Sequence, residues 1–311
     1  MLRPRALRVR RASIAPRLLS LLVCISLFSC QSIPEYENSV DHSNTTHAMS
    51  NLIIPESAST SILAQQALAK FNVVMMSTEL AEAERAQFLF RRGLLFDSVG
   101  LDGLAFYDFQ QALRFDPTLY EAYNSLGIHH TVRGEFIEAY DAFDAVVEMA
   151  PEYEFAYLNR AMALYYAKRY ELSLPDIETY YHHDTQDTYR LLWAYIIASK
   201  IDKNRALIDL QQRRELMIND QWANKIVDFY LGNISQKSLL DSVVVGVESR
   251  NQLNKRLCEV YFYLGKYYRE LGQNRVATNF FKLALSTNVF EFVEHRFARV
   301  EIAAIRDANI Q

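Results

Sequence analysis

A 34-residue pattern occurs four times in this 311-residue chain and constrains its fold more than any other feature. Gly93, Gly127 and Ala161 hold equivalent positions in three consecutive stretches, and Gly265 holds the same position in a fourth. Small, aromatic and, in two stretches, proline residues follow at fixed offsets. A period of this length is typical of stacked helical hairpins, each of which buries its apolar face against its neighbours.

The packing role of these residue types explains the pattern. A glycine in the first helix lets the second helix of the same hairpin approach closely, and an alanine in the second helix does the same from the other side. An aromatic side chain then fills the gap between one hairpin and the next; these residues are Phe109, Phe143 and Phe281. Further glycines are predicted to turn the chain between helices because glycine tolerates positive φ; they are Gly100, Gly134 and Gly272.

The offsets match the signature of the tetratricopeptide repeat (TPR) at its own spacing. The repeats fall at residues 86–119, 120–153, 154–187 and 258–291. The third is degenerate, because it lacks the turn glycine and places Pro175 inside its second helix. The signature fades over residues 188–257 while helical spacing persists, which predicts irregular hairpins between the third and last repeats. We therefore predict an all-α TPR solenoid over residues 61–311.

Residues 1–29 have the form of a secretory signal. Six arginines precede an apolar run over residues 18–28, which is too short to span a membrane. Removal of this segment leaves 27 Lys and Arg against 37 Asp and Glu, a net charge of −10. Such a balance argues against nucleic acid as a partner, because phosphates require a basic face.

A cysteine stands directly after this segment. Leu27, Ser29 and Cys30 resemble a bacterial lipobox, although Phe28 is bulkier than usual at its position. The resemblance implies that Cys30 becomes the first residue and carries diacylglycerol and an N-acyl chain, and that the enterobacterial sorting rule directs it to the outer membrane. An ordinary signal peptide with an incidental Cys30 is the alternative. Residues 30–60 are then predicted to be a flexible tether, because serine, asparagine and threonine dominate them.

Motifs for chemistry are missing from the sequence. No metalloprotease, serine-hydrolase or phosphate-loop pattern occurs, so we expect neither a catalytic residue nor a metal nor a cofactor. The adjacent pairs His129–His130 and His182–His183 are poor metal ligands, because neighbours on a helix point about 100° apart. Cys258 is expected to be a buried thiol, since no partner for a disulfide remains after lipidation of Cys30.

Function is therefore predicted to lie on the concave face that the first helices build. Amide groups there can hold a peptide backbone and apolar side chains can anchor it. The predicted partner-binding groove comprises Arg91, Leu94, Asn124, Ile128, Asn159, Met162 and Tyr165. Asn124 and Asn159 are the strongest candidates, with solvated or locally bonded amides as the alternative.

Four runs resemble, in the same order, the NlpI family of enterobacterial TPR lipoproteins: ERAQFLFRRGLLFDSVGL at 84–101, VDFYLGNIS at 227–235, FYLGKYY at 262–268 and FVEHRFA at 292–298. The resemblance implies a homodimeric adaptor that is anchored in the outer membrane and faces the periplasm. It further implies docking of a tail-specific protease and of peptidoglycan hydrolases, with regulated degradation of a cell-wall endopeptidase.

Two other functions stay open at this point. One is a structural TPR subunit of an outer-membrane assembly complex, which would associate stably with an integral membrane protein. The other is an enzyme acting on the cell wall, which would digest peptidoglycan unaided. The adaptor is the hypothesis that the resemblance favours.

Overall fold

The computed structural model describes residues 49–50, 52–57, 62–77, 79–218 and 221–308, all within one compact unit of the chain, 43–311. The predicted signal, Cys30 and most of the tether lie outside the described residues.

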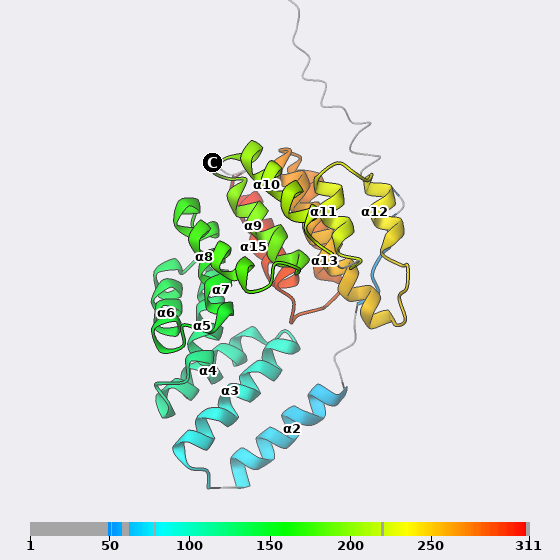
Figure 1. The fold of residues 1–311 in the computed structure, drawn as a ribbon. Helices are drawn as coiled ribbons and strands as arrows, with labels where there is room; N and C mark the ends of the chain where they lie inside the picture. The colour runs from blue at the N-terminus through cyan, green and yellow to red at the C-terminus, as the bar shows by residue number, and fades with distance from the viewer. Residues whose placement is uncertain (1–48, 51, 58–61, 78, 219–220, 309–311) are drawn as a thin grey trace, which may run out of the picture. The chain divides into compact units, whose positions relative to one another are not determined.

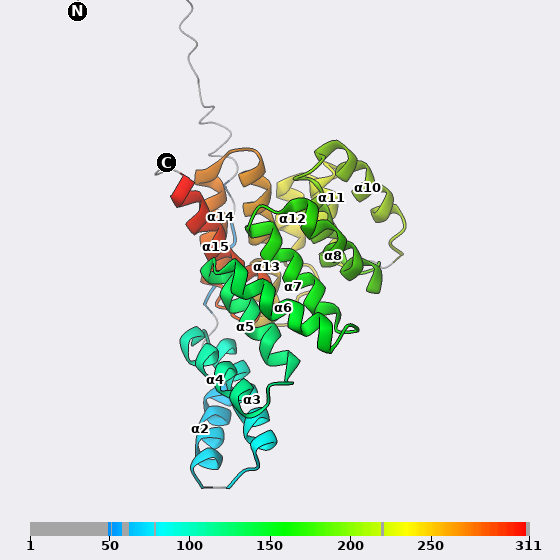
Figure 2. The ribbon, with the colours of Figure 1, turned by 90° about the vertical axis from the view of Figure 1, so that its left-hand side faces the viewer.

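Helices alone make up the regular structure of these residues (Figures 1 and 2). In chain order they are α2 Ile62–Ser77, α3 Glu82–Ser98, α4 Asp102–Phe115, α5 Tyr120–Arg133, α6 Phe136–Met149, α7 Glu154–Tyr166, α8 Tyr170–His183, α9 Thr188–Ala198, α10 Lys203–Glu215, α11 Asn224–Tyr230, α12 Gln236–Ser242, α13 Arg250–Glu270, α14 Asn274–Ser286 and α15 Val293–Ala308. The pairs α3/α4, α5/α6, α7/α8 and α13/α14 are the four predicted repeats, and α9 to α12 are the irregular hairpins between them.

Each glycine of the signature lies against the phenylalanine of its own hairpin. A Cβ atom added to Gly127 would lie 2.5 Å from Cε1 of Phe143, and the same contact recurs between Gly93 and Phe109. The close approach of the two helices is confirmed, and the ring fills space within the hairpin as well as beyond it. The third repeat carries alanine at the glycine position and Ile177 at the phenylalanine position, so a smaller side chain accompanies the extra Cβ.

Left-handed backbone marks the turn of every repeat, including the degenerate one. Gly134 has φ 76°, and Lys168 takes the same position in the third repeat with φ 60°. The missing turn glycine therefore did not change the turn. Lys168 adopts a conformation that costs a residue with a side chain about 1–2 kcal/mol.

Lys168→Gly is accordingly expected to raise the free energy of unfolding by about 0.5–1 kcal/mol, because relief of the strain exceeds the extra entropy of glycine in the unfolded chain. Denaturant titration measures the change. The control is Lys168→Ala, which removes the same long side chain but keeps the Cβ and should bring no such gain. Equal stability of the two variants would contradict the left-handed conformation of Lys168.

Pro175 does not interrupt the second helix of the third repeat, since α8 continues from Tyr170 to His183. Ser173, which replaces the signature alanine, donates its hydroxyl to the Ala161 carbonyl at 2.7 Å. A side-chain hydrogen bond thus ties α8 to α7 close to the proline.

Residues 52–57 differ from the predicted tether. Pro55 is buried, and Ile53 packs against the largest hydrophobic core, which α7 to α15 build. The part of the predicted tether that the structure describes is therefore docked on the helices.

Candidate functional site

The predicted groove asparagines bond to each other. Asn159 donates from Nδ2 to Oδ1 of Asn124 at 2.9 Å, and both side chains are buried. These amides join the first helices of the second and third repeats, α5 and α7. Neither the predicted role in peptide binding nor the alternative of solvated or locally bonded amides describes this contact, because it joins two residues 35 positions apart in neighbouring repeats.

The other predicted groove residues divide by exposure. Arg91 is exposed and Leu94 keeps 44% of its surface, so both are open to a partner. Ile128 is half-buried and packs against the cluster of Ala139, Phe143 and Ala163. Met162 is fully buried and Tyr165 nearly so, so neither offers a partner an open surface.

The C-terminal helix α15 occupies the concave face at these positions. Glu301 of α15 accepts hydrogen bonds from Lys266 Nζ at 2.7 Å and from the Tyr166 hydroxyl at 3.0 Å, and it also pairs with Arg269. Phe297 stacks on Tyr166 with ring centroids 4.9 Å apart. The chain itself thus fills the region where the sequence analysis placed a partner.

Ion pairs extend this contact to the first repeat. Arg296 of α15 lies 3.3 Å from Asp97 of α3, and Asp97 also bonds His129 of α5 at 3.0 Å. His130 instead contacts Glu135 at 2.6 Å. The two adjacent histidines have different carboxylate partners, and the described residues contain no cluster able to hold a metal ion.

Burial shifts the pKa of several groups on α13. It lowers the pKa of Lys266, and the neighbouring Arg269 lowers it further. Cys258 is a fully buried free thiol, as predicted, and burial raises its pKa. Glu259 lines a cavity of about 330 Å³, where burial and then the charge of Glu294 raise its pKa to about 8.

The raised pKa of Glu259 predicts a pH-dependent stability. Between the ordinary pKa of 4.5 and about 8, the folded chain holds a proton that the unfolded chain has released. Stability should therefore fall as pH rises through this window, by up to about 1.4 kcal/mol per pH unit. Glu259→Gln removes this contribution, so its stability relative to wild type should increase between pH 5 and pH 7. Unfolding titrations at both pH values test this, with a variant of the exposed Glu291, Glu291→Gln, as control. The raised pKa of Glu259 would be refuted if the free energy of unfolding changed equally with pH in wild type and in Glu259→Gln.

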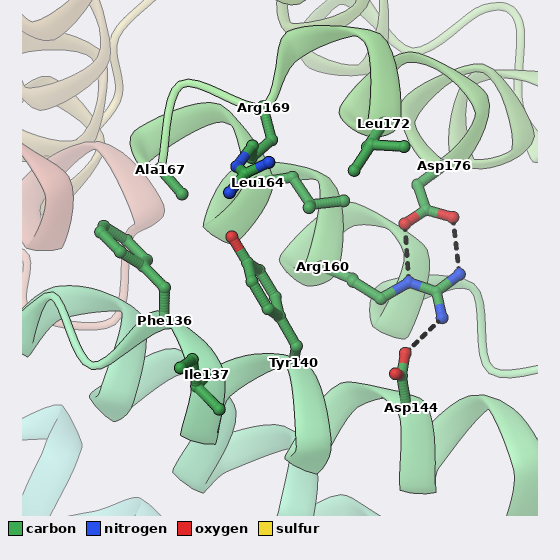
Figure 3. Close-up of a pocket in the computed structure, with 10 residues that line it drawn as sticks. All are labelled: Phe136, Ile137, Tyr140, Asp144, Arg160, Leu164, Ala167, Arg169, Leu172 and Asp176. Carbon is green, nitrogen blue, oxygen red and sulfur yellow. Dashed lines mark hydrogen bonds and ion pairs between the residues drawn. The ribbon is translucent and has the colours of Figure 1, made fainter.

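A groove of about 570 Å³ lies between α6, α7 and α8 (Figure 3). Its rim carries two aliphatic side chains that solvent reaches, Ile137 of α6 at 72% exposure and Leu172 of α8 at 61%. Tyr140 stands in the centre with its hydroxyl pointing toward Arg169. Exposed apolar side chains around a hollow are typical of protein-docking surfaces.

Arg160 fixes the shape of the groove. Its guanidinium makes two bonds of 2.7 Å to Asp176 of α8 and one of 2.7 Å to Asp144 of α6. These hydrogen bonds raise the pKa of Arg160, and those to Asp176 have the largest effect. Arg169 is exposed and has no carboxylate partner among the described residues. The groove therefore combines a fixed floor with one cation that is free to pair.

The groove and α15 contact opposite faces of α7. Successive helical residues turn by 100°, so Arg160 and Leu164 lie on one face. Tyr165, Tyr166 and Met162 lie on the other, from which the tyrosine hydroxyls reach the Lys266–Glu301 pair. A partner in the groove would leave α15 in place.

Sequence reasoning missed this groove because it searched the first helices only. Ile137 and Leu172 are apolar residues at second-helix positions that the TPR signature leaves free. Apolar residues outside the signature positions were the available signal.

Comparison with known proteins gives no family assignment. No protein-family model matches the chain. The chain is similar to MamA from Desulfovibrio magneticus, at 14% identity over 66% of this chain and 96% of that one, with a TM-score of 0.41. It is similar to YrrB, described as a TPR protein with an unusual peptide-binding site, at 13% identity over 81% and 100%, with a TM-score of 0.39. A tetratricopeptide repeat protein from Parabacteroides merdae is 15% identical over 78% of each chain, with a TM-score of 0.47.

At these identities and scores, the likeness carries no argument about function. Within the described part of the chain, no helix has both the length and the apolar character needed to cross a membrane. The order of the hairpins, the glycine–phenylalanine contacts and the left-handed turns are those of an all-α TPR helical-hairpin solenoid.

Proposed function

We propose that the protein is a non-catalytic scaffold that docks partner proteins in the α6–α8 groove. The observation that carries this proposal is the exposed pair Ile137 and Leu172 beside the unpaired Arg169. The complementary partner segment would present an apolar side chain between the two aliphatic residues and a carboxylate to the arginine.

The finer proposal is an adaptor anchored to the outer membrane through lipid on Cys30 and facing the periplasm. Its partners would be a tail-specific protease and peptidoglycan hydrolases, and docking would promote degradation of a cell-wall endopeptidase. The form of residues 1–30 and the resemblance to the NlpI family support this proposal. The same resemblance supports a homodimer.

Membrane fractionation tests the anchor. The Cys30→Ala variant is expected to leave the membrane fraction while its helical circular dichroism stays unchanged, because only the lipid attachment is lost. A variant that stays with the outer membrane would rule out Cys30 as the anchor.

Affinity purification tests the groove. Leu172→Asp places a charge on the apolar rim and should reduce recovery of protease and endopeptidase at least tenfold. The matched control is Leu104→Asp, which alters the equivalent second-helix position two repeats earlier, where leucine is 50% exposed. Equal recovery with both variants would argue against the groove, and recovery of an integral membrane assembly protein in place of the hydrolases would favour the structural subunit.

A further inference from the structure

Residues 52–57 run along α13 without forming a helix or turn (Figure 1). The Tyr261 hydroxyl donates to the Ile53 carbonyl at 2.5 Å, and Asn254 Nδ2 donates to the Glu56 carbonyl at 2.8 Å. The Ser57 hydroxyl donates to the carbonyl of Ser286 at the end of α14, at 2.9 Å. Side chains of α13 therefore bind the backbone of a segment about 200 residues away.

The order of these contacts gives the direction of the segment. Ile53 lies against Tyr261 and Glu56 lies against Asn254, so the segment runs antiparallel to α13. From Tyr261 back to Asn254 is seven residues of helix, or about 10.5 Å, and three residues of extended chain span about 10–11 Å. An extended segment therefore matches the spacing of the two donors.

The two donors on α13 are buried and are suited to binding the carbonyl groups of a peptide backbone. Asn254 is 2% exposed and Tyr261 is fully buried, so the segment covers both. An amide and a hydroxyl that bind carbonyl groups do not depend on the side chains of the peptide. They give affinity for an extended chain of any sequence.

Side chains of the segment supply the selectivity. Leu52 and Ile53 pack against the core and Pro55 is buried, whereas Ile54 is 70% exposed. Proline suits this position because it has no backbone N–H to leave unpaired and its φ is already restricted. Glu56 pairs with Arg250 at 2.6 Å on the exposed surface. The preferred pattern is two aliphatic residues, any residue, proline and an acidic residue.

We propose that Arg250, Asn254 and Tyr261 form a binding site for an extended peptide of this pattern from a partner protein, and that residues 52–57 occupy the site in cis. Residues 52–57 are held weakly enough for a partner peptide to displace them. Their attachment includes three hydrogen bonds, each contributing about 0.5–1.5 kcal/mol net, the exposed ion pair of Glu56 with Arg250, and the apolar contacts of Leu52, Ile53 and Pro55. Segments with few buried contacts open locally without unfolding the domain. The site does not depend on the α6–α8 groove, so either can fail alone.

Peptide binding to the full chain tests the proposal. The probe is a fluorescent peptide with the sequence of residues 49–57, MSNLIIPES. The double variant Ile53→Asp, Pro55→Asp should release the segment and bind the probe at least tenfold more tightly than wild type, because the competing segment is gone. The control Ile54→Asp alters the exposed neighbour and should bind as wild type does. Binding by the released variant that is no tighter than that of wild type overturns the proposal.

Two further measurements identify the site. In the released variant, Tyr261→Phe should weaken probe binding about 2- to 10-fold, because it removes one donor to the backbone. Unchanged affinity would overturn the assignment to α13. Should the released variant fail to fold, limited proteolysis of wild type gives the answer: saturating probe should speed cleavage within residues 52–57, because the displaced segment is exposed, and unchanged rates would refute exchange of the segment.

Discussion

Glu301→Ala is expected to lower the free energy of unfolding by about 3–5 kcal/mol, because it leaves the buried Lys266 without its carboxylate. Glu301 is fully buried and Lys266 is 2% exposed in its side chain, with their charged atoms 2.7 Å apart. Removing the acid strands Lys266 in the core and removes a partner of Arg269 and Tyr166. Urea titration followed by circular dichroism measures the loss.

The control is the exposed pair Lys237 and Asp241, whose side chains are 72% and 63% exposed. Lys237→Ala should cost less than about 1 kcal/mol, because water screens such pairs. The double variant Lys266→Met, Glu301→Leu should recover much of the loss by replacing the ion pair with apolar side chains of similar volume. A loss of less than 1 kcal/mol for Glu301→Ala would show that α15 is not held on the concave face by this pair.

The position of α15 changes where a partner can bind. A TPR solenoid offers its concave face to ligands only where that face is open. Here Phe297 and Glu301 cover it between α7 and α13, while the groove of Ile137 and Leu172 lies on the other face of α7. The face of α7 that stays accessible is therefore the one that lines the α6–α8 groove, and Leu94 of the first repeat stays exposed as well.

The sequence predicted the repeats well because their signature records contacts between near neighbours. Gly127 and Phe143 lie 16 positions apart, and their types reveal the contact. The positions of α15 and of residues 52–57 were not predictable in this way. Tyr166 and Glu301 are 135 residues apart, and Asn254 and Glu56 are 198 apart. No periodicity links residues so distant. The polar residues at both sites could equally have been predicted to face solvent.

The predicted groove shows the same limit at single residues. Asn124 and Asn159 occupy first-helix positions where an amide suggested peptide binding, yet each amide binds the other. A polar residue on the inner face of a solenoid can serve the next repeat or a ligand, and the signature does not distinguish the two. Only the distance between the two side chains decides.

The pairing of glycine with phenylalanine predicts a strong energetic coupling in the second repeat. Gly127→Ala should cost about 1–3 kcal/mol, because the added Cβ meets the Phe143 ring at 2.5 Å. Phe143→Ile alone should also destabilise, because the smaller side chain leaves space beside the glycine. Together the two changes reproduce the alanine and isoleucine of the third repeat, where both residues are fully buried. The double variant should therefore be more stable than the sum of the two losses predicts, by about 1–2 kcal/mol.

A double-mutant cycle in urea measures this coupling, and the third repeat supplies the reverse experiment. Ile177→Phe beside Ala161 should overpack that hairpin and cost about 1–3 kcal/mol, whereas Ala161→Gly, Ile177→Phe should restore the pairing of the other repeats. Additive losses in both cycles would mean that each hairpin adjusts its helix spacing independently of these two positions. Coupling of the expected sign in both would establish that one small–large pair sets the separation of the helices in every repeat, including the degenerate one.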